Sequence, residues 1–181
     1  MGLNKTLKGE RLMKIIEALK QTKDLKRKAD DLRDLVKDHC AISTLETQKY
    51  PNQTKQVSEW MQAHSDVLKE MLRLRVAIQR TNLEVKVTIK LGEKQIEKTI
   101  AEWIHRRRDL ANEDLSIWNV LGDRGIHEGM AKGPTGDPVE IKVNRFYDPA
   151  ERDNKKDLYS SEPSIIDAKL EVVNAVTDLI E

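Results

Sequence analysis

The chain has 181 residues, a length that suits one domain, or one domain with an extended arm. Hydrophobic residues make up 38% of it, charged residues 35% and aromatic residues 4%, a composition typical of long amphipathic helices. The apolar residues are periodic rather than sparse, which excludes a wholly disordered chain. The formal net charge of +1 means that bulk charge predicts no partner.

The charge is unevenly distributed along the chain. Residues 1–55 carry 13 basic and 8 acidic side chains, a net +5, whereas residues 137–181 carry 6 basic and 11 acidic side chains, a net −5. The two ends can therefore attract each other within one subunit or between subunits.

Three features bear on where the protein works. Cys40 is the only cysteine, which excludes an intrachain disulfide and suits a reducing compartment. Charges interrupt residues 1–16, so the sequence predicts no signal peptide there. No run approaches the ~18 apolar residues of a membrane span. We expect a cytoplasmic protein without a membrane partner, or a virion protein if the gene belongs to a phage.

Residues 1–9 are predicted to form an N-terminal extension, and residues 10–181 a single helical domain. The first helix is predicted from about Glu10 to Asp38, because apolar residues recur at helical spacing among strong helix formers. The residues expected to face its core are Leu12, Ile16, Leu19, Leu25, Ala29, Leu32 and Val36.

The clearest pattern lies in a second helix, predicted from about Lys55 to Arg80 after a connection at Pro51. Spacings of three and four alternate along one seam, which is a heptad pattern held for three repeats. The seam consists of Val57, Trp60, His64, Val67, Met71, Leu74 and Ile78. Such a seam needs a partner helix, and two long helices joined by a loop form an antiparallel hairpin. The same residues would serve between chains, so the sequence leaves open where the partner comes from.

After the predicted hairpin, apolar residues recur at every second position. Residues 85–91 alternate Val, Val, Ile and Leu with polar residues, which predicts a strand with one buried face. A turn follows, and a short return strand is predicted over residues 94–98. Thr99 and Glu102 then have the spacing of a capping box, which opens a third helix that extends to about Leu121.

Residues 122–138 contain five glycines and two prolines, which predicts a flexible Gly-rich loop. A second strand is predicted from residue 139 to about residue 147 and is expected to pair with the strand at 85–91. Residues 150–160 are predicted to be a polar helix and residues 161–180 an amphipathic one, with Pro163 either starting the second or kinking a longer helix. The predicted fold class is mainly α: a long antiparallel helical hairpin plus further helices, with a small two- or three-stranded β element.

Three short motifs follow one another along residues 10–181. They are Ile78-Gln79-Arg80-Thr81-Asn82; Thr99-Ile100-Ala101-Glu102 with Arg107, Arg108 and Asp109; and Ile166-Asp167-Ala168-Lys169-Leu170 with Asn174 and Asp178-Leu179. In content and order these motifs resemble the septicolysin-like family of small, mostly uncharacterised bacterial proteins. The resemblance implies a helical-hairpin protein and carries over no catalytic residue. The chain departs from the family pattern at the Gly-rich loop and at the extended N-terminus.

Candidate catalytic and metal-binding residues are few. The four histidines are His39, His64, His105 and His127. No two have the i, i+4 spacing of a helical metal pair, so we predict no metal and no cofactor. His64 lies in the seam, where a polar residue fixes register. Asp123, His127 and Glu128 could form an acid–base cluster in a small hydrolase or metal enzyme, but nothing in the sequence positions them. The chain also lacks a nucleophile elbow and a phosphate loop, so no enzyme is predicted.

Arg106, Arg107 and Arg108 form the strongest basic run. Consecutive helical residues point in different directions, since each step rotates by ~100°. Some of these side chains are therefore expected to pair with acidic residues on neighbouring helices. A nucleic-acid-associated protein that uses this run and the basic first helix is the alternative function, although the few aromatic residues disfavour a stacking platform.

The favoured interpretation is a non-catalytic structural or interaction protein. Its expected partners are further copies of the chain or other protein subunits, bound through the seam of the second helix or through the oppositely charged ends. The Gly-rich loop and the N-terminal extension are expected to reach neighbouring subunits. Such features suit a component of a large assembly, such as a phage particle.

Overall fold

The structure is a computed structural model that describes residues 12–180, so the predicted extension over residues 1–9 lies outside the described residues. The elements, in chain order, are α1 (Ile15–His39), α2 (Gln53–Glu84), β1 (Lys86–Leu91), β2 (Lys94–Thr99), α3 (Ile100–His105), the π-helical turn η1 (Arg106–Leu110), α4 (Ala111–Asn119), β3 (Gly129–Lys132), β4 (Pro138–Ile141) and α5 (Pro149–Val176). The fold is mainly α with two small antiparallel sheets, which confirms the predicted fold class.

Within the described range the chain divides into two compact units. We call residues 12–85 and 171–180 the hairpin unit, and residues 86–170 the strand-bearing unit. The prediction of a single domain over residues 10–181 stays a prediction.

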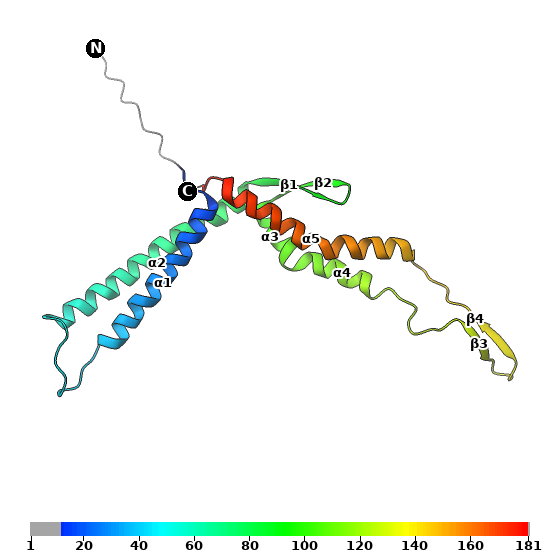
Figure 1. The fold of residues 1–181 in the computed structure, drawn as a ribbon, viewed down its shortest axis with the longest axis horizontal. Helices are drawn as coiled ribbons and strands as arrows, with labels where there is room; N and C mark the ends of the chain where they lie inside the picture. The colour runs from blue at the N-terminus through cyan, green and yellow to red at the C-terminus, as the bar shows by residue number, and fades with distance from the viewer. Residues whose placement is uncertain (1–11, 181) are drawn as a thin grey trace, which may run out of the picture. The chain divides into compact units, whose positions relative to one another are not determined.

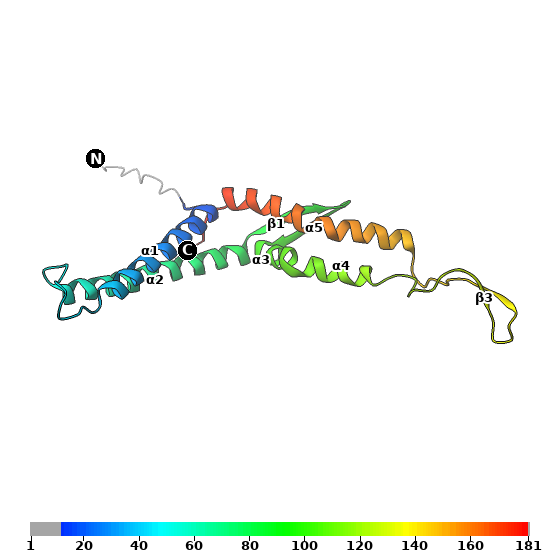
Figure 2. The ribbon, with the colours of Figure 1, turned by 60° about the horizontal axis from the view of Figure 1, so that its bottom comes forward.

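The hairpin unit is built on α1 and α2, which lie antiparallel and side by side (Figures 1 and 2). Asn52 caps α2, because its side-chain oxygen accepts a hydrogen bond from the backbone N–H of Lys55 at 2.9 Å. Ala29 and Leu32 of α1 pack against Val67 of α2. Four residues of the predicted seam, Val67, Met71, Leu74 and Ile78, are buried, and Val57, Trp60 and His64 are half-buried.

The predicted core face of α1 is partly wrong. Leu12 precedes the helix, and Ile16 and Leu19 are 45% and 44% exposed. The centre of the buried face is instead formed by Ile15, Ala18, Thr22, Leu25, Ala29, Leu32 and Val36, all of them buried or half-buried. These alternate spacings of three and four without interruption, as a straight seam against a neighbouring helix requires. The predicted positions from Leu25 to Val36 lie on this buried face. Those from Leu12 to Leu19 were chosen for their larger side chains and lie on another face.

Residues 177–180 pack against the start of α1 and the last turns of α2 through hydrogen bonds. Backbone hydrogen bonds run from Ile15 N–H to the carbonyl oxygen of Thr177 at 3.0 Å and from Leu179 N–H to that of Met13 at 2.7 Å. The N–H of Ile180 donates to the hydroxyl of Thr81 at 2.8 Å. Val173 and Leu179 are buried by this arrangement.

In the strand-bearing unit, β1 and β2 form the predicted hairpin. Val87, Ile89 and Leu91 are buried, which confirms the alternating strand. Gly92 has a φ of +60° at the first position of the two-residue turn, a conformation that side chains rarely adopt.

The second predicted strand pairs differently from the prediction. The segment Pro138–Ile141 (β4) pairs with Gly129–Lys132 (β3), which belongs to the predicted Gly-rich loop, and not with the strand at 85–91. Closing a hairpin over the five residues 133–137 costs less chain entropy than closing the ~50 residues to β1.

The third predicted helix begins as expected, with a capping box in which Thr99 and Glu102 bond to each other's backbone N–H. It contains a π-helical turn before α4. The last helix is one continuous element, α5, with Pro163 inside it. Up to Leu170, α5 lies alongside α3 and α4 in both ribbon views (Figures 1 and 2).

Candidate interaction surface

Helix α2 carries a second stripe besides its buried seam. The stripe consists of Met61, Ser65, Leu68, Leu72, Val76, Gln79 and Leu83, all of them exposed. Their spacings of three and four place them on one side of the helix, roughly 130° round from the buried seam at ~100° per residue. A helix in an isolated two-helix hairpin needs one apolar stripe, whereas two stripes are typical of bundles with more helices.

Two exposed apolar residues of α1 lie at the matching end, and a third, Leu35, lies near the other end of the helix and is 37% exposed. Ile16 and Leu19 are in its first turns, which lie beside the last turns of α2 in an antiparallel hairpin. Because antiparallel helices rotate in opposite senses, Ile16 and Leu19 face the same side of the two-helix layer as the stripe on α2. Thr81, which binds the end of the chain, lies on the other flank of the buried seam.

We call this exposed apolar surface the open face. It consists of Ile16, Leu19, Met61, Leu68, Leu72, Val76 and Leu83. Along α2 its rim is polar, with Arg73 bonded to Glu70 at 2.9 Å and Lys69 bonded to Asp66 at 3.1 Å. Hydrogen bonds from Arg73 lower the pKa of Glu70, and those from Gln62 and then Lys69 lower the pKa of Asp66. The centre of this face is apolar, and the charges at its rim are paired within the helix. Another surface can therefore cover it without burying an unpaired charge.

The arginine run lies in the strand-bearing unit, on the π-helical turn η1 that follows α3. Arg106 bonds to Glu162 and Asp114, Arg107 to Asp167, and Arg108 to neighbouring Asp109 at 3.2 Å. The expectation that some of these side chains pair with acidic residues on neighbouring helices is therefore confirmed. Each guanidinium already contacts a carboxylate, and the nucleic-acid role of the run stays a prediction.

Aromatic rings cluster at the closed end of the hairpin, where the connection joins the helices. The ring centroids of His39, Tyr50 and Trp60 are 5.3–5.6 Å apart, and Tyr50 meets the other two edge to face. The seam position of Trp60 was predicted, but its two partners were not: Tyr50 lies in the connection, and the predicted first helix ended at Asp38, although His39 continues the spacing of its buried face.

The structure does not gather the predicted acid–base cluster of Asp123, His127 and Glu128 into a metal-binding group. Asp123 instead forms a two-pronged ion pair with Arg145, at 2.6 and 2.7 Å, and the oxygen of Glu128 accepts a bond from Val143 N–H. Among residues 12–180, no three His, Cys, Asp or Glu side chains gather closely enough to hold a metal ion. Within the same range, no helix is long and apolar enough to cross a membrane.

Two features were missed from the sequence. The second stripe of α2 could have been found by testing the remaining phases of the same helix for the spacing of three and four. Glu162, which is buried and pairs with Arg106, carries no local signal, because its partner lies 56 positions away.

Comparison with known proteins gives one structural likeness. No protein-family model matches the chain, and no curated protein matches it. The solved structure of a functionally unknown conserved protein from Corynebacterium diphtheriae is similar, with a TM-score of 0.55 and 21% identity over 93% of this chain and 99% of that one. At this identity the likeness shows the fold alone. The resemblance to the septicolysin-like family stays a prediction.

Proposed function

We propose that the chain is a non-catalytic interaction protein that self-associates, two copies packing through their open faces. The observation that carries this proposal is the second apolar stripe on α2, which stays exposed although the hairpin is complete; Leu72, at its centre, is 63% exposed. A contiguous apolar surface with a polar rim is typical of a protein–protein interface.

A second copy of the chain fits this surface because the open face can match itself. A two-fold axis that lies between the two facing layers sets the stripe on α2 of one copy against the same stripe of the other, so that leucine meets leucine. The stripe from Met61 to Leu83 is about 33 Å long at 1.5 Å per residue, and two helices are about 20 Å wide. Face-to-face packing would then bury about 1,300 Å² in total, within the range of stable interfaces.

The β3–β4 hairpin supports the assembly role as a second contact. Most of its side chains are exposed, including Met130 and Val139, so it has little core of its own. The Asp123–Arg145 ion pair joins the two segments that lead into and out of it. An exposed hairpin tied at its base can add its strand edges to a neighbouring subunit.

The test is the solution mass of the full chain and of a variant in which Leu68→Asp and Leu72→Asp are combined. We expect a dimer or a multiple of it for the parent chain and a monomer of unchanged helicity for the variant, because four charges would face one another across the two-fold axis. The matched control is Leu45→Asp, at a 95% exposed loop position, which should leave the mass unchanged.

Light scattering during size exclusion gives the mass, and circular dichroism gives the helicity. A monomeric parent chain, or a double variant that keeps the parent's mass, would overturn the proposal. A 260/280 nm absorbance ratio that is high and collapses with salt would replace it with the nucleic-acid alternative.

A further inference from the structure

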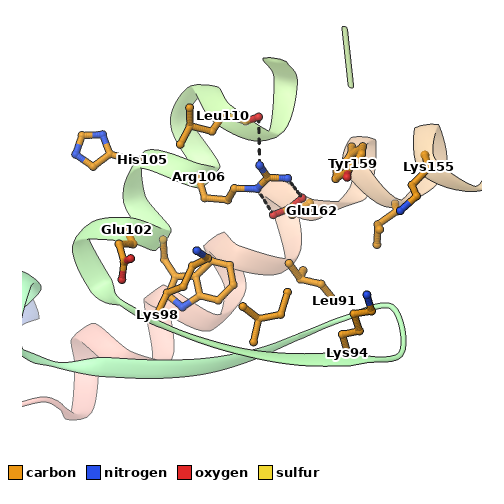
Figure 3. A pocket seen from close by; sticks show the side chains of 13 residues that line it. Leu91, Lys94, Lys98, Glu102, His105, Arg106, Leu110, Lys155, Tyr159 and Glu162 are labelled. Carbon is orange, nitrogen blue, oxygen red and sulfur yellow. Dashed lines mark hydrogen bonds and ion pairs between the residues drawn. The ribbon is translucent and has the colours of Figure 1, made fainter. Parts of the chain in front are cut away.

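A cavity of about 510 Å³ lies in the strand-bearing unit. Its walls come from the β1–β2 hairpin, from α3 with the π-helical turn, and from α5 (Figure 3). The apolar part of the lining consists of Leu91, Ile96, Trp103, Leu110 and Leu158. This volume lies within the range of pockets that hold small organic molecules.

Two irregular helix turns meet at this cavity. On one wall, the π-helical turn Arg106–Leu110 begins and ends with residues that line it. On another wall, Pro163 follows Glu162 inside α5 and has no N–H to donate to the carbonyl oxygen of Tyr159. Since π-helical turns in helices occur frequently at functional sites, their placement here points to a binding cavity rather than a packing defect.

The centre of the cavity wall is a preformed ion pair. Arg106 donates to the two oxygens of Glu162 at 2.6 and 2.8 Å, and Glu162 is only 2% exposed. The guanidinium also bonds to Asp114 and lies over the ring of Tyr159, 5.4 Å from its centroid. The hydrogen bonds that Arg106 donates to Glu162 and then to Asp114 raise its pKa above the usual value. Because its donors are used in this way, Arg106 shapes the wall and leaves ligand charge to other residues.

Three lysines supply that charge. Lys94, Lys98 and Lys155 line the cavity, and none of them forms an ion pair within residues 12–180. Lys155 instead lies over the ring of Trp118, 6.0 Å from its centroid. Hydrogen bonds from Thr99, and then the charge of Lys98, lower the pKa of Glu102 on the rim, but Lys98 and Glu102 form no ion pair. An apolar cavity is therefore edged by three lysines that form no ion pair among residues 12–180 (Figure 3).

We propose that this cavity binds a small organic anion with an apolar body, namely an acyl or aryl carboxylate. The carboxylate binds at a lysine of the cavity rim, Lys98 on one side or Lys155 on the other (Figure 3). The body lies against Leu91, Ile96 and Trp103, out of water. Both parts are needed, because surface lysines alone hold a carboxylate weakly and the apolar lining alone would not select charge.

Calorimetric titration of the full chain with four probes tests the proposal: decanoate, 1-naphthoate, decanol and decyltrimethylammonium. We expect saturable binding of at least one carboxylate, and at least tenfold weaker binding of decanol and of the ammonium. Decanoate binding best indicates an acyl ligand, and naphthoate binding best indicates an aryl one. Backbone amide shifts should fall within residues 91–110 and 155–162. No saturable carboxylate binding, or equal binding of the cationic probe, would overturn the proposal.

Variants separate the cavity from other surfaces. The combination Lys98→Ala and Lys155→Ala should weaken carboxylate binding at least tenfold, and Lys98→Arg with Lys155→Arg should restore most of it. The matched control is Lys90→Ala, on β1 but outside this cavity, which should bind as the parent chain does. The open-face variant with Leu68→Asp and Leu72→Asp should also bind normally. An equal loss in either control would mean that the carboxylate binds elsewhere, which overturns the proposal.

Discussion

The contacts that join the helices inside the hairpin unit differ from those inside the strand-bearing unit. In the hairpin unit, α1 and α2 pack through apolar side chains spaced as a regular heptad, around Leu32, Val67 and Leu74. In the strand-bearing unit, the helices bury apolar residues such as Trp103 and Ile166, the ion pairs Arg106–Glu162 and Arg107–Asp167 also join them, and a cavity lies beside these contacts. The difference indicates where each kind of function can be located: assembly on the hairpin unit and small-molecule binding in the strand-bearing unit.

The largest effect is expected from Arg106→Leu, which strands the carboxylate of Glu162 in a buried position. Removing one partner of a buried ion pair costs about 3–5 kcal/mol, because the remaining charge keeps its desolvation penalty. Hydrogen exchange should show the loss of protection in residues 86–170 and little change in residues 15–84. The double variant Arg106→Leu with Glu162→Leu should recover most of the loss. Equal loss in single and double variants would show that side-chain packing, and not the charge, is what matters there.

The converse test is Leu74→Ala in the hairpin unit. Leu74 is fully buried, and truncation of such a leucine costs about 2–5 kcal/mol through lost transfer energy and the cavity left behind. Urea unfolding with hydrogen exchange should place the loss in residues 15–84. The matched control is Leu72→Ala, two positions along the same helix and 63% exposed, measured at a concentration where the chain is monomeric. A control as damaging as Leu74→Ala would mean that the open face is covered within one chain.

The hairpin unit could be predicted further from the sequence than the strand-bearing unit. A heptad seam is a local pattern, so residues 57–78 identify α2 and its buried face without knowledge of the partner. The phase of α1 was harder, because Ile16 and Leu19 are larger than Ala18 and Thr22. Burial on α1 depends on which side of the helix faces α2 and not on side-chain size. That side is set by how the two helices pack.

In the strand-bearing unit the decisive contacts join distant positions. The capping box and the β1–β2 turn were predictable, because each depends on residues within four positions of one another. The pairing of β3 with β4 was missed, since Gly129–Lys132 lacks the alternation that identifies a strand. The Arg106–Glu162 pair and the cavity beside it depend on how α5 lies against α3. Charged residues show no period that reveals such a pairing in advance.

The smallest effect is expected at the ion pair between Asp123 and Arg145, which unlike Arg106–Glu162 is exposed to solvent. Hydrogen bonds from Arg145 hold the pKa of the Asp123 carboxyl below its usual value of 3.8. A lowered pKa in the folded state means that the pair contributes above pH 3.8 and that its contribution is lost as the pH falls through the lowered value. Between pH 7 and pH 5 the β3–β4 hairpin should therefore be unaffected.

This expectation can be checked at one carboxyl group and one amide. An NMR titration should give Asp123 a pKa below 3.8 in the parent chain and a value close to 3.8 in Arg145→Gln. Exchange of the Gly133 N–H, which bonds to the carbonyl oxygen of Asp137 at 2.8 Å, should quicken in that variant. Global stability should stay the same, because exposed ion pairs are screened and contribute little. A large loss of global stability in Arg145→Gln would contradict this expectation. It would mean that the Asp123–Arg145 pair stabilises the whole unit, as the buried Arg106–Glu162 pair is expected to do, and not only the base of the β3–β4 hairpin.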